Sequence, residues 1–204
     1  PRSQGGADTP VFGRLPVPDG AAVGCFCESD AVYDSFDDGD FARHAEGSGC
    51  VYDNRTQRNA IRKIKVKHDG EYLCFLLRTK QPVTPYDGTG SWMRLYLNTT
   101  GGQGYQFVLN THPAPDGTTT LARVTGTDDD LTAADLPDVA AFYEVDGDKF
   151  KIKVPLRALG LDPDGFTVWF KAADSREPIA SVEDFYDKGD VAPLGRMNFV
   201  YRGK

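Results

Sequence analysis

The sequence predicts an all-β fold, a two-sheet antiparallel β-sandwich. Apolar residues recur with a period of two through the middle and the C-terminal half, which is the pattern of strands with one buried face. The 22 glycines and 13 prolines leave almost no stretch in which a helical period could run. Many short strands separated by turn residues are typical of two packed sheets.

Two hairpins are the clearest local signals. Apolar and basic residues alternate over residues 60–67, and the turn His68-Asp69-Gly70 leads into the apolar run 71–79. An Asp-Gly turn signal at residues 146–148 predicts the second hairpin, and residues 155–161 predict one short helical turn. The second hairpin joins the predicted strands 141–145 and 149–154. The remaining predicted strands are residues 92–98, 104–110, 118–124, 166–172 and 198–201.

One domain is the simplest organisation. Residues 1–20 have the Pro, Gly and polar make-up of an irregular arm, and residues 21–204 carry the predicted strands without a linker or internal repeat. Trp169 is expected in the core because it stands in mid-strand, and His68 is expected to be a solvated turn residue. The basic residues of the stretch 62–67 are expected on the solvent face of their strand.

Composition limits the partners of the chain. The formal net charge of −7 and the pI near 4.9 argue against nucleic acid, because a phosphate-binding surface needs clustered Lys and Arg. No run of about 18 apolar residues exists, so a membrane span is not expected. The sequence starts at Pro1 without an initiating Met, and the missing signal peptide therefore says little about export.

The cysteines leave the redox compartment open. Their spacing matches neither a zinc ribbon nor a CxxC redox site, so buried free thiols and one or two disulfides in a secreted protein both remain. Two glycosylation triplets, at Asn54 and Asn98, are short enough to arise by chance. The four cysteines, whose pairing is undetermined, are Cys25, Cys27, Cys50 and Cys74.

Signatures of catalysis are mostly absent. The chain has no GxSxG, no HExxH and no phosphate-binding glycine loop, and its three histidines stand in unrelated segments. The acidic loops near residues 34–40 and 128–130 are explained by turn capping and solubility, although calcium takes such oxygens as ligands. Paired loop carboxylates would also suit a small glycoside hydrolase, which needs two of them about 5–10 Å apart.

Aromatic residues beside loops are the more suggestive feature. Sugar rings bind by laying their C–H faces on Trp and Tyr while polar side chains take the hydroxyls. Tyr86 and Trp92 flank a loop rich in Pro and Gly, and Tyr186 lies in a late loop. For each of the three, core packing is the competing interpretation.

Several blocks of the sequence together resemble a known family. They occur in order from about residue 30 to the end, at residues 52–59, 65–75, 84–86, 91–97, 104–110, 184–186 and 189–196. They are similar to bacterial domains related to the family-nine carbohydrate-binding modules, within the wider sugar- or haem-binding β-sandwich superfamily called DOMON. The resemblance implies a sandwich of the immunoglobulin or jelly-roll type. Arg94 stands where the family has a sugar-binding Glu, and Tyr186 takes the place of a late-loop Trp.

The function implied is a non-catalytic carbohydrate-binding module that serves polysaccharide degradation. Its expected binding residues are Tyr86, Trp92, Arg94 and Tyr186, with no catalytic residue, no certain cofactor and calcium as the candidate ion. The expected partners are a carbohydrate and a catalytic glycoside hydrolase, and the expected location is secreted or cell-surface. Three alternatives stay open: a small glycoside hydrolase, a haem-binding redox domain using Met93 or Met197 with a histidine, and an interaction domain without a small ligand.

Overall fold

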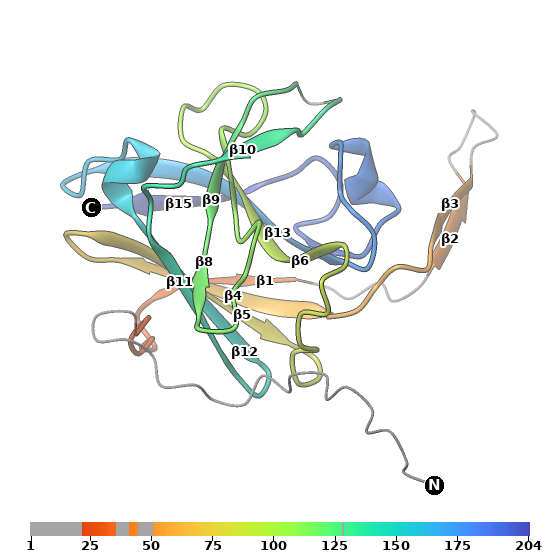
Figure 1. The fold of residues 1–204 in the computed structure, drawn as a ribbon, viewed down its shortest axis with the longest axis horizontal. Coiled ribbons are helices and arrows are strands. Elements are labelled where there is room, and N and C mark those ends of the chain that lie inside the picture. Colours follow the sequence, from red (N-terminus) through yellow and green to blue (C-terminus); the bar gives the residue numbers. More distant parts are fainter. Residues whose placement is uncertain (1–21, 36–40, 45–50, 128) are drawn as a thin grey trace, which may run out of the picture.

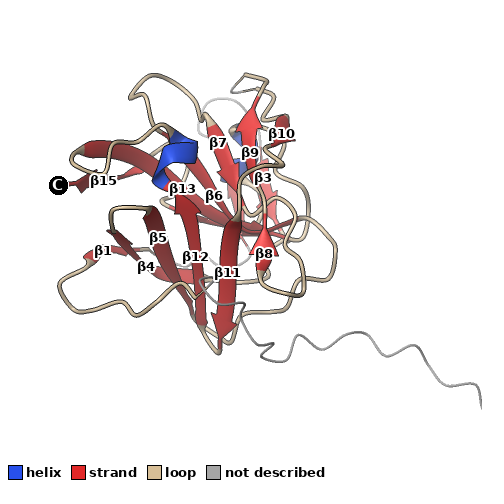
Figure 2. Cartoon of the chain, turned by 60° about the vertical axis from the view of Figure 1, so that its left-hand side comes forward, coloured by secondary structure: helices blue, strands red, loops and turns tan. Residues whose placement is uncertain are grey.

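A computed structural model describes residues 22–35, 41–44, 51–127 and 129–204 of the chain. The fold is a sandwich of two antiparallel sheets with two short 3-10 helices, as the sequence predicts (Figures 1 and 2). The irregular arm predicted for residues 1–20 lies outside the described residues, as does Cys50. No helix in the described residues has the length and apolar character to cross a membrane.

The first sheet has six strands. Its order is β1 (Ala31–Asp34), β4 (Ile61–His68), β5 (Tyr72–Thr79), β12 (Lys149–Pro155), β11 (Ala141–Asp146) and β8 (Thr118–Thr119). Both predicted hairpins belong to it, because β4 pairs with β5 and β11 pairs with β12. The predicted helical turn is the 3-10 helix η1 (Leu156–Leu159), which follows β12 directly.

The second sheet has seven strands. Six follow the order β10 (Ala133–Asp135), β9 (Leu121–Val124), β7 (Phe107–Leu109), β6 (Ser91–Asn98), β13 (Phe166–Ser175) and β14 (Asp190–Ala192), and β15 (Phe199–Gly203) also pairs with β13. The second 3-10 helix, η2 (Glu183–Tyr186), lies between β13 and β14. A separate ribbon of β2 (Phe41–His44) and β3 (Val51–Asn54) projects from the body (Figure 1).

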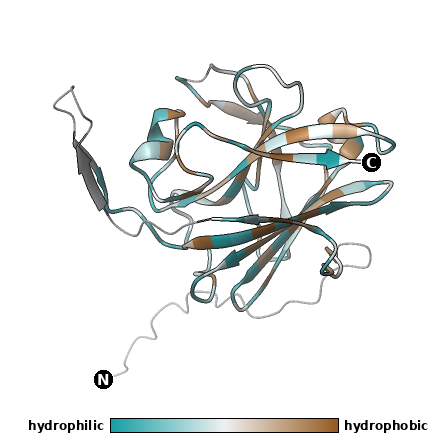
Figure 3. Cartoon of the chain, turned by 180° about the vertical axis from the view of Figure 1, so that it is seen from behind, coloured by the Kyte–Doolittle hydropathy of each residue, from teal (hydrophilic) through white to brown (hydrophobic). Residues whose placement is uncertain are grey.

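The main core fills the space between the two sheets. Period-two alternation delivers Phe75 from β5, Leu95 from β6 and Phe170 from β13 to this layer, each fully buried. The hydropathy colours alternate along the strands in the same way (Figure 3). The consecutive residues Trp92 and Met93 both belong to this main core, because Met93 has a φ of 43° and breaks the pleat.

A second apolar layer covers part of the outer face of the second sheet. The cover segment, residues 177–189, packs Ile179, Val182 and Phe185 against that face. Tyr96 of β6 lies beneath it, 1% exposed, with its ring centroid 5.0 Å from that of Phe185. The second sheet is therefore buried on both sides over its central strands, and only its margins reach solvent.

The basic face of β4 is only partly open to solvent. The ammonium of Lys65 donates to the carbonyl of Cys27 over 2.8 Å, and that of Lys67 donates to the carbonyl of Cys25. Lys153 of β12 donates to the carbonyl of Ala22 over 2.9 Å. The lysines predicted on a wet strand face thus hold residues 22–27 across the first sheet.

Two sequence expectations about single residues are wrong. Trp169 is half-buried on the outer face of β13 and belongs to neither apolar cluster, because its neighbours Val168 and Phe170 take the inward positions. His68 is not a solvated turn residue, because its Nδ1 lies 2.8 Å from the hydroxyl of Tyr201 on β15. The distant C-terminal strand covers a position that the sequence places beside a turn.

Both glycosylation triplets have a buried asparagine. Asn54 is 2% exposed and donates through Nδ2 to the carbonyl of Gly189 over 2.6 Å. Asn98 is 4% exposed and donates through Nδ2 to the carbonyls of Gly102 and Gly104. Each amide nitrogen organises a turn of the folded chain, so neither triplet presents a free acceptor in this structure.

Candidate functional site

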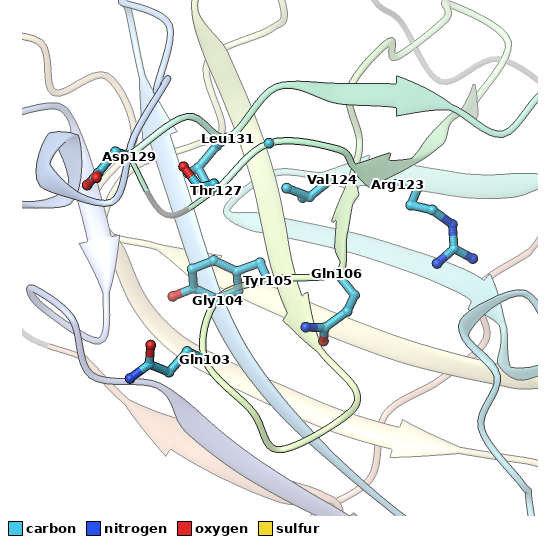
Figure 4. A pocket seen from close by; sticks show the side chains of 10 residues that line it. Gln103, Gly104, Tyr105, Gln106, Arg123, Val124, Thr127, Asp129 and Leu131 are labelled. Atoms are coloured by element: carbon cyan, nitrogen blue, oxygen red, sulfur yellow. The ribbon is translucent and has the colours of Figure 1, made fainter.

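A hollow of about 510 Å³ opens at the margin of the second sheet, outside the cover segment (Figure 4). One wall is residues 103–106, which lead into β7, and the opposite wall is formed by the end of β9 together with residues 126, 127, 129 and 131. The sheet brings the walls together because β7 and β9 are antiparallel neighbours, with Phe107 opposite Arg123. The lining residues are Gln103, Gly104, Tyr105, Gln106, Arg123, Val124, Gly126, Thr127, Asp129 and Leu131.

Apolar side chains form the floor of the hollow. Tyr105 is 8% exposed, and its ring packs against Tyr96 and Phe185 with centroid distances of 5.6 and 6.0 Å. Its hydroxyl donates to Oδ1 of Asn198 over 2.6 Å. Leu131 is 6% exposed in the opposite wall. The ring contacts and the hydrogen bond fix the floor in one position.

Hydrogen-bonding side chains line the rim. The guanidinium of Arg123 lies over the ring of Phe107, 4.8 Å from its centroid, and remains exposed. Gln106 accepts at Oε1 from the backbone N–H of Thr99 over 2.8 Å, which leaves its amide N–H₂ group at the hollow. Gln103 is exposed on the same wall (Figure 4). Phe107 belongs to the main core and Tyr105 to the outer apolar cluster, so the Arg123 guanidinium lies on the other face of the sheet. The two amides therefore present donors to a ligand in the hollow.

The opposite wall is a tight turn. The carboxylate of Asp130 accepts from the backbone N–H of Thr132 over 3.0 Å and from its hydroxyl over 2.5 Å. These bonds lower the pKa of Asp130, so it stays ionised as a turn cap. A Cβ at Gly126 would overlap the carbonyl of Asp130, so only glycine fits there. The turn presents Thr127 and Asp129, both exposed, toward the hollow.

A side cavity of about 70 Å³ adjoins the hollow. It shares Gly104 and Tyr105 with the hollow, and its other lining residues are Val182, Phe185, Arg196 and Asn198. The ring of Tyr105 therefore stands between the two spaces. The side cavity is too small for a sugar ring but large enough for a few waters or a ligand substituent.

The structure does not bring the four predicted binding residues together, and none of them lines the hollow. Trp92 is 2% exposed, donates through Nε1 to the carbonyl of Thr84 and packs on Tyr86 with ring centroids 5.7 Å apart. The structure therefore places Trp92 in the core, which was the competing interpretation for this residue. Tyr186 is 39% exposed at the end of η2, and a Cβ at Gly195 would lie 3.0 Å from its ring.

Arg94 lies on the outer face of β6, close to Tyr96. Its Nη2 donates to the carbonyl of Thr111 over 3.5 Å, and its Nε is buried without a hydrogen-bond partner in the described structure. The hydroxyl of Tyr96 is likewise buried and unpartnered, and burial raises its pKa. Arg94 is thus separated from Tyr86 and Trp92 by the thickness of the sheet.

Residues from three of the sequence blocks that carry the family resemblance contribute to a buried polar network, whose centre, Asp174, lies outside those blocks. Arg58 donates through Nε and Nη2 to the two carboxylate oxygens of Asp174, over 3.3 and 3.2 Å, with both side chains fully buried. Asp174 also accepts from the backbone N–H groups of Asn59 and Met93. Nearby, Asp190 accepts from the backbone N–H of Ile61. These blocks lock β13 and β14 to the segment before β4.

The described residues contain no group of three or more His, Cys, Asp or Glu side chains that could hold a metal ion. Several exposed aspartates have a lowered pKa because a neighbouring threonine caps them, as at Asp87 with Thr89 and at Asp116 with Thr118. A general acid for glycoside hydrolysis needs a raised pKa instead. Among the described aspartates, burial raises the pKa of Asp174 and of Asp187. The acidic positions 36–40 and 128 lie outside the described residues.

The site residues were missed for a local reason. The sequence predicts a strand over residues 104–110, whereas β7 begins at Phe107 and the residues before it form the wall. The double glycine at positions 101 and 102 signals a turn but does not show which strand the turn will face.

Comparisons of the chain with protein-family models, curated protein sequences and solved structures found no match.

Proposed function

We propose that this β-sandwich is a non-catalytic carbohydrate-binding domain whose binding site is the hollow between residues 103–106 on one side and residues 126, 127, 129 and 131 on the other. The observation that carries the proposal is the combination of an apolar floor at Tyr105 and Leu131 with a rim of amide, hydroxyl and carboxylate groups. A sugar ring has the same division into apolar C–H faces and equatorial hydroxyls.

The volume of the hollow and the fixed position of its wall support the proposal. Its volume of about 510 Å³ falls within the usual range for small-ligand sites, roughly 300–1,000 Å³. The hydrogen bonds of Tyr105 with Asn198 and of Gln106 with Thr99 hold one wall in place before a ligand arrives. A preformed site loses little conformational entropy on binding, which favours modules that bind a ligand and do not transform it.

The sequence resemblance to domains related to the family-nine carbohydrate-binding modules supports the same class of ligand. From that resemblance alone we propose a secreted or cell-surface location and a glycoside hydrolase as partner. The site differs from the one that the resemblance implies. Gln103 and Gln106 would take the hydroxyls, in place of the predicted set of Tyr86, Trp92, Arg94 and Tyr186.

Retention on polysaccharide affinity gels tests the proposal. The wild-type chain is run through gels containing xylan, laminarin, hydroxyethylcellulose or glycol chitin, each with calcium and with a chelator. We expect retardation by at least one gel and loss of that retardation in Gln103→Ala and Gln106→Ala. The matched control is Gln81→Ala, which removes the same chemical group from an exposed position outside the hollow.

Each outcome of the retention test has a defined meaning. Retardation that is equal in the hollow variants and in their control would refute the hollow as the site. Absence of retardation on every gel would refute carbohydrate binding and favour an interaction domain. Retardation that chelator removes would add calcium to the site. Release of reducing sugar from a gel polysaccharide would refute the non-catalytic assignment and favour the glycoside hydrolase alternative.

A further inference from the structure

The two tryptophans of the chain lie in different environments. Trp92 belongs to the main core, whereas Trp169 is half-buried on the outer face of β13 and lies outside both apolar clusters. Its ring rests against the loop after β6, where a Cβ at Gly101 would come within 3.0 Å of its Cη2 atom. A glycine at this position lets the backbone support the edge of the indole.

Polar side chains surround the exposed part of Trp169. Its cross-strand partners are Asn98 of β6 and Val200 of β15. Thr167 precedes it by two residues on the same face of β13 and pairs with Arg202 of β15, which is exposed. An aromatic ring beside a hydroxyl and a guanidinium is the arrangement that a sugar needs for stacking and for hydrogen bonding of its hydroxyls.

The surroundings of Trp169 are bonded to the walls of the hollow. The backbone N–H of Thr99, which follows β6, donates to Gln106 of the hollow. Tyr105 of the hollow donates to Asn198, which precedes β15. Both segments that flank Trp169 therefore continue into the wall or the floor of the proposed binding site.

The distance from the hollow to Trp169 suits an extended ligand. The strand order β9, β7, β6, β13 places Trp169 three strand spacings from Arg123. At about 4.8 Å per spacing this is about 15 Å across the sheet, which is longer than one sugar ring. A single ligand that touches both places must be an oligosaccharide.

We propose that Trp169 is a second subsite of the carbohydrate site, which stacks one ring of an oligosaccharide while the hollow binds another. The inference rests on the proposed function and specifies its ligand as a chain of at least three sugars. Stacking on Trp169 adds affinity for long chains and none for ligands that fill the hollow alone. The cover segment leaves Trp169 accessible while it buries Lys171 and Ala173, the next two residues on the same face of β13.

Chain-length dependence tests the inference. Isothermal titration compares cellohexaose, xylohexaose, laminarihexaose and chitohexaose with their disaccharides for the wild type, Trp169→Ala and Trp169→Phe. We expect Trp169→Ala to bind the preferred hexasaccharide about tenfold more weakly and the disaccharide unchanged. Trp169→Phe retains an aromatic ring, so its affinity for the hexasaccharide should lie between that of the wild type and that of Trp169→Ala. Thermal unfolding of each variant shows that it is folded, and the half-exposed position predicts that it is.

Tryptophan fluorescence supplies an independent readout in the wild-type chain. Acrylamide should quench Trp169 and spare the buried Trp92, and the preferred hexasaccharide should protect the quenched fraction. Bound hexasaccharide without protection would overturn the inference, as would equal losses of hexasaccharide and disaccharide affinity in Trp169→Ala. No binding of any sugar by the wild type would refute the proposed function itself, and the inference with it. Loss of affinity in Trp169→Ala but not in Gln106→Ala would keep the Trp169 subsite and refute the hollow.

Discussion

Arg58 and Asp174 are 116 residues apart in the sequence and form a two-point ion pair with both side chains fully buried. The pair joins the segment before β4 in the first sheet to the end of β13 in the second. Burial raises the pKa of Asp174, and the guanidinium of Arg58 opposes that rise. Arg58 also pairs with Asp87 over 3.3 Å, whereas Arg58 is the cationic partner of the buried Asp174 carboxylate.

Removal of the guanidinium should therefore destabilise the fold strongly. Arg58→Met leaves Asp174 buried without its counter-charge, and we expect a loss of about 3–5 kcal/mol in the free energy of unfolding. The control is Arg78→Met, which breaks the pair with Asp148 where the arginine side chain is 50% exposed, and about 0–1 kcal/mol is expected there. Urea unfolding measures both, and equal losses would contradict the role given to the buried pair.

Two glycines with similar positive φ angles allow the cost of backbone strain to be measured apart from the cost of steric overlap. Gly189 has a φ of 61° and lies against β13, where a Cβ would overlap the carbonyl oxygen of Asp174. Gly147 has a φ of 58° in the β11–β12 hairpin and faces open space. Gly147→Ala should cost about 1 kcal/mol from the left-handed conformation alone. Gly189→Ala should cost several times more, and similar unfolding temperatures for the two variants would refute the close approach.

The strands were predictable from the sequence because their signals are local. Residues 60–79 show both the period of two and the turn that joins the strands, and the structure confirms that hairpin as β4 and β5. Trp169 illustrates a signal that was present but not used. Its neighbours Val168 and Phe170 are both apolar, so the alternation already assigns Trp169 to the opposite face.

The site was not predictable from the same signals. The hollow exists because β9 pairs with β7 and because residues 126, 127, 129 and 131 face residues 103–106, and both relationships depend on the packed sheet. The burial of Trp92 depends on the left-handed conformation of Met93 and on the register shift between Ala173 and Ser175. Spacing along the chain carries no information about either irregularity.

The buried Lys171 predicts an unusual dependence of stability on pH. Its ammonium donates to the carbonyl of Pro193 and lies 5.2 Å from the ring centroid of Phe185, and burial lowers its pKa from 10.5 to about 7. Above pH 7 the unfolded chain keeps this proton while the folded chain releases it. The unfolding free energy should therefore rise with pH from about 7 to 8.5, by up to about 1.4 kcal/mol per pH unit.

The variant Lys171→Met isolates this contribution. It retains an unbranched apolar side chain without a titrating group, so its stability should lack the rise between pH 7 and 8.5. The window ends near pH 8.5 because the thiol of Cys74, whose pKa burial raises to about 11, begins to lose its proton in the unfolded chain there, which lowers stability. Urea unfolding at half-unit pH steps measures both proteins. Parallel curves for the two would show that Lys171 keeps an ordinary pKa in the folded state.

The cysteines of the described residues should differ sharply in reactivity. Cys25 and Cys27 are exposed on the segment that lies across the first sheet, whereas Cys74 is 3% exposed on β5 and burial raises its pKa to about 11. Only a thiolate attacks iodoacetamide, so at pH 8 the two exposed thiols should be alkylated in minutes and Cys74 only after denaturation. Peptide mass spectrometry after timed alkylation distinguishes the sites. Alkylation of Cys74 in the native protein at the rate of Cys25 would mean that residues 22–27 leave the sheet readily and expose the thiol beneath them.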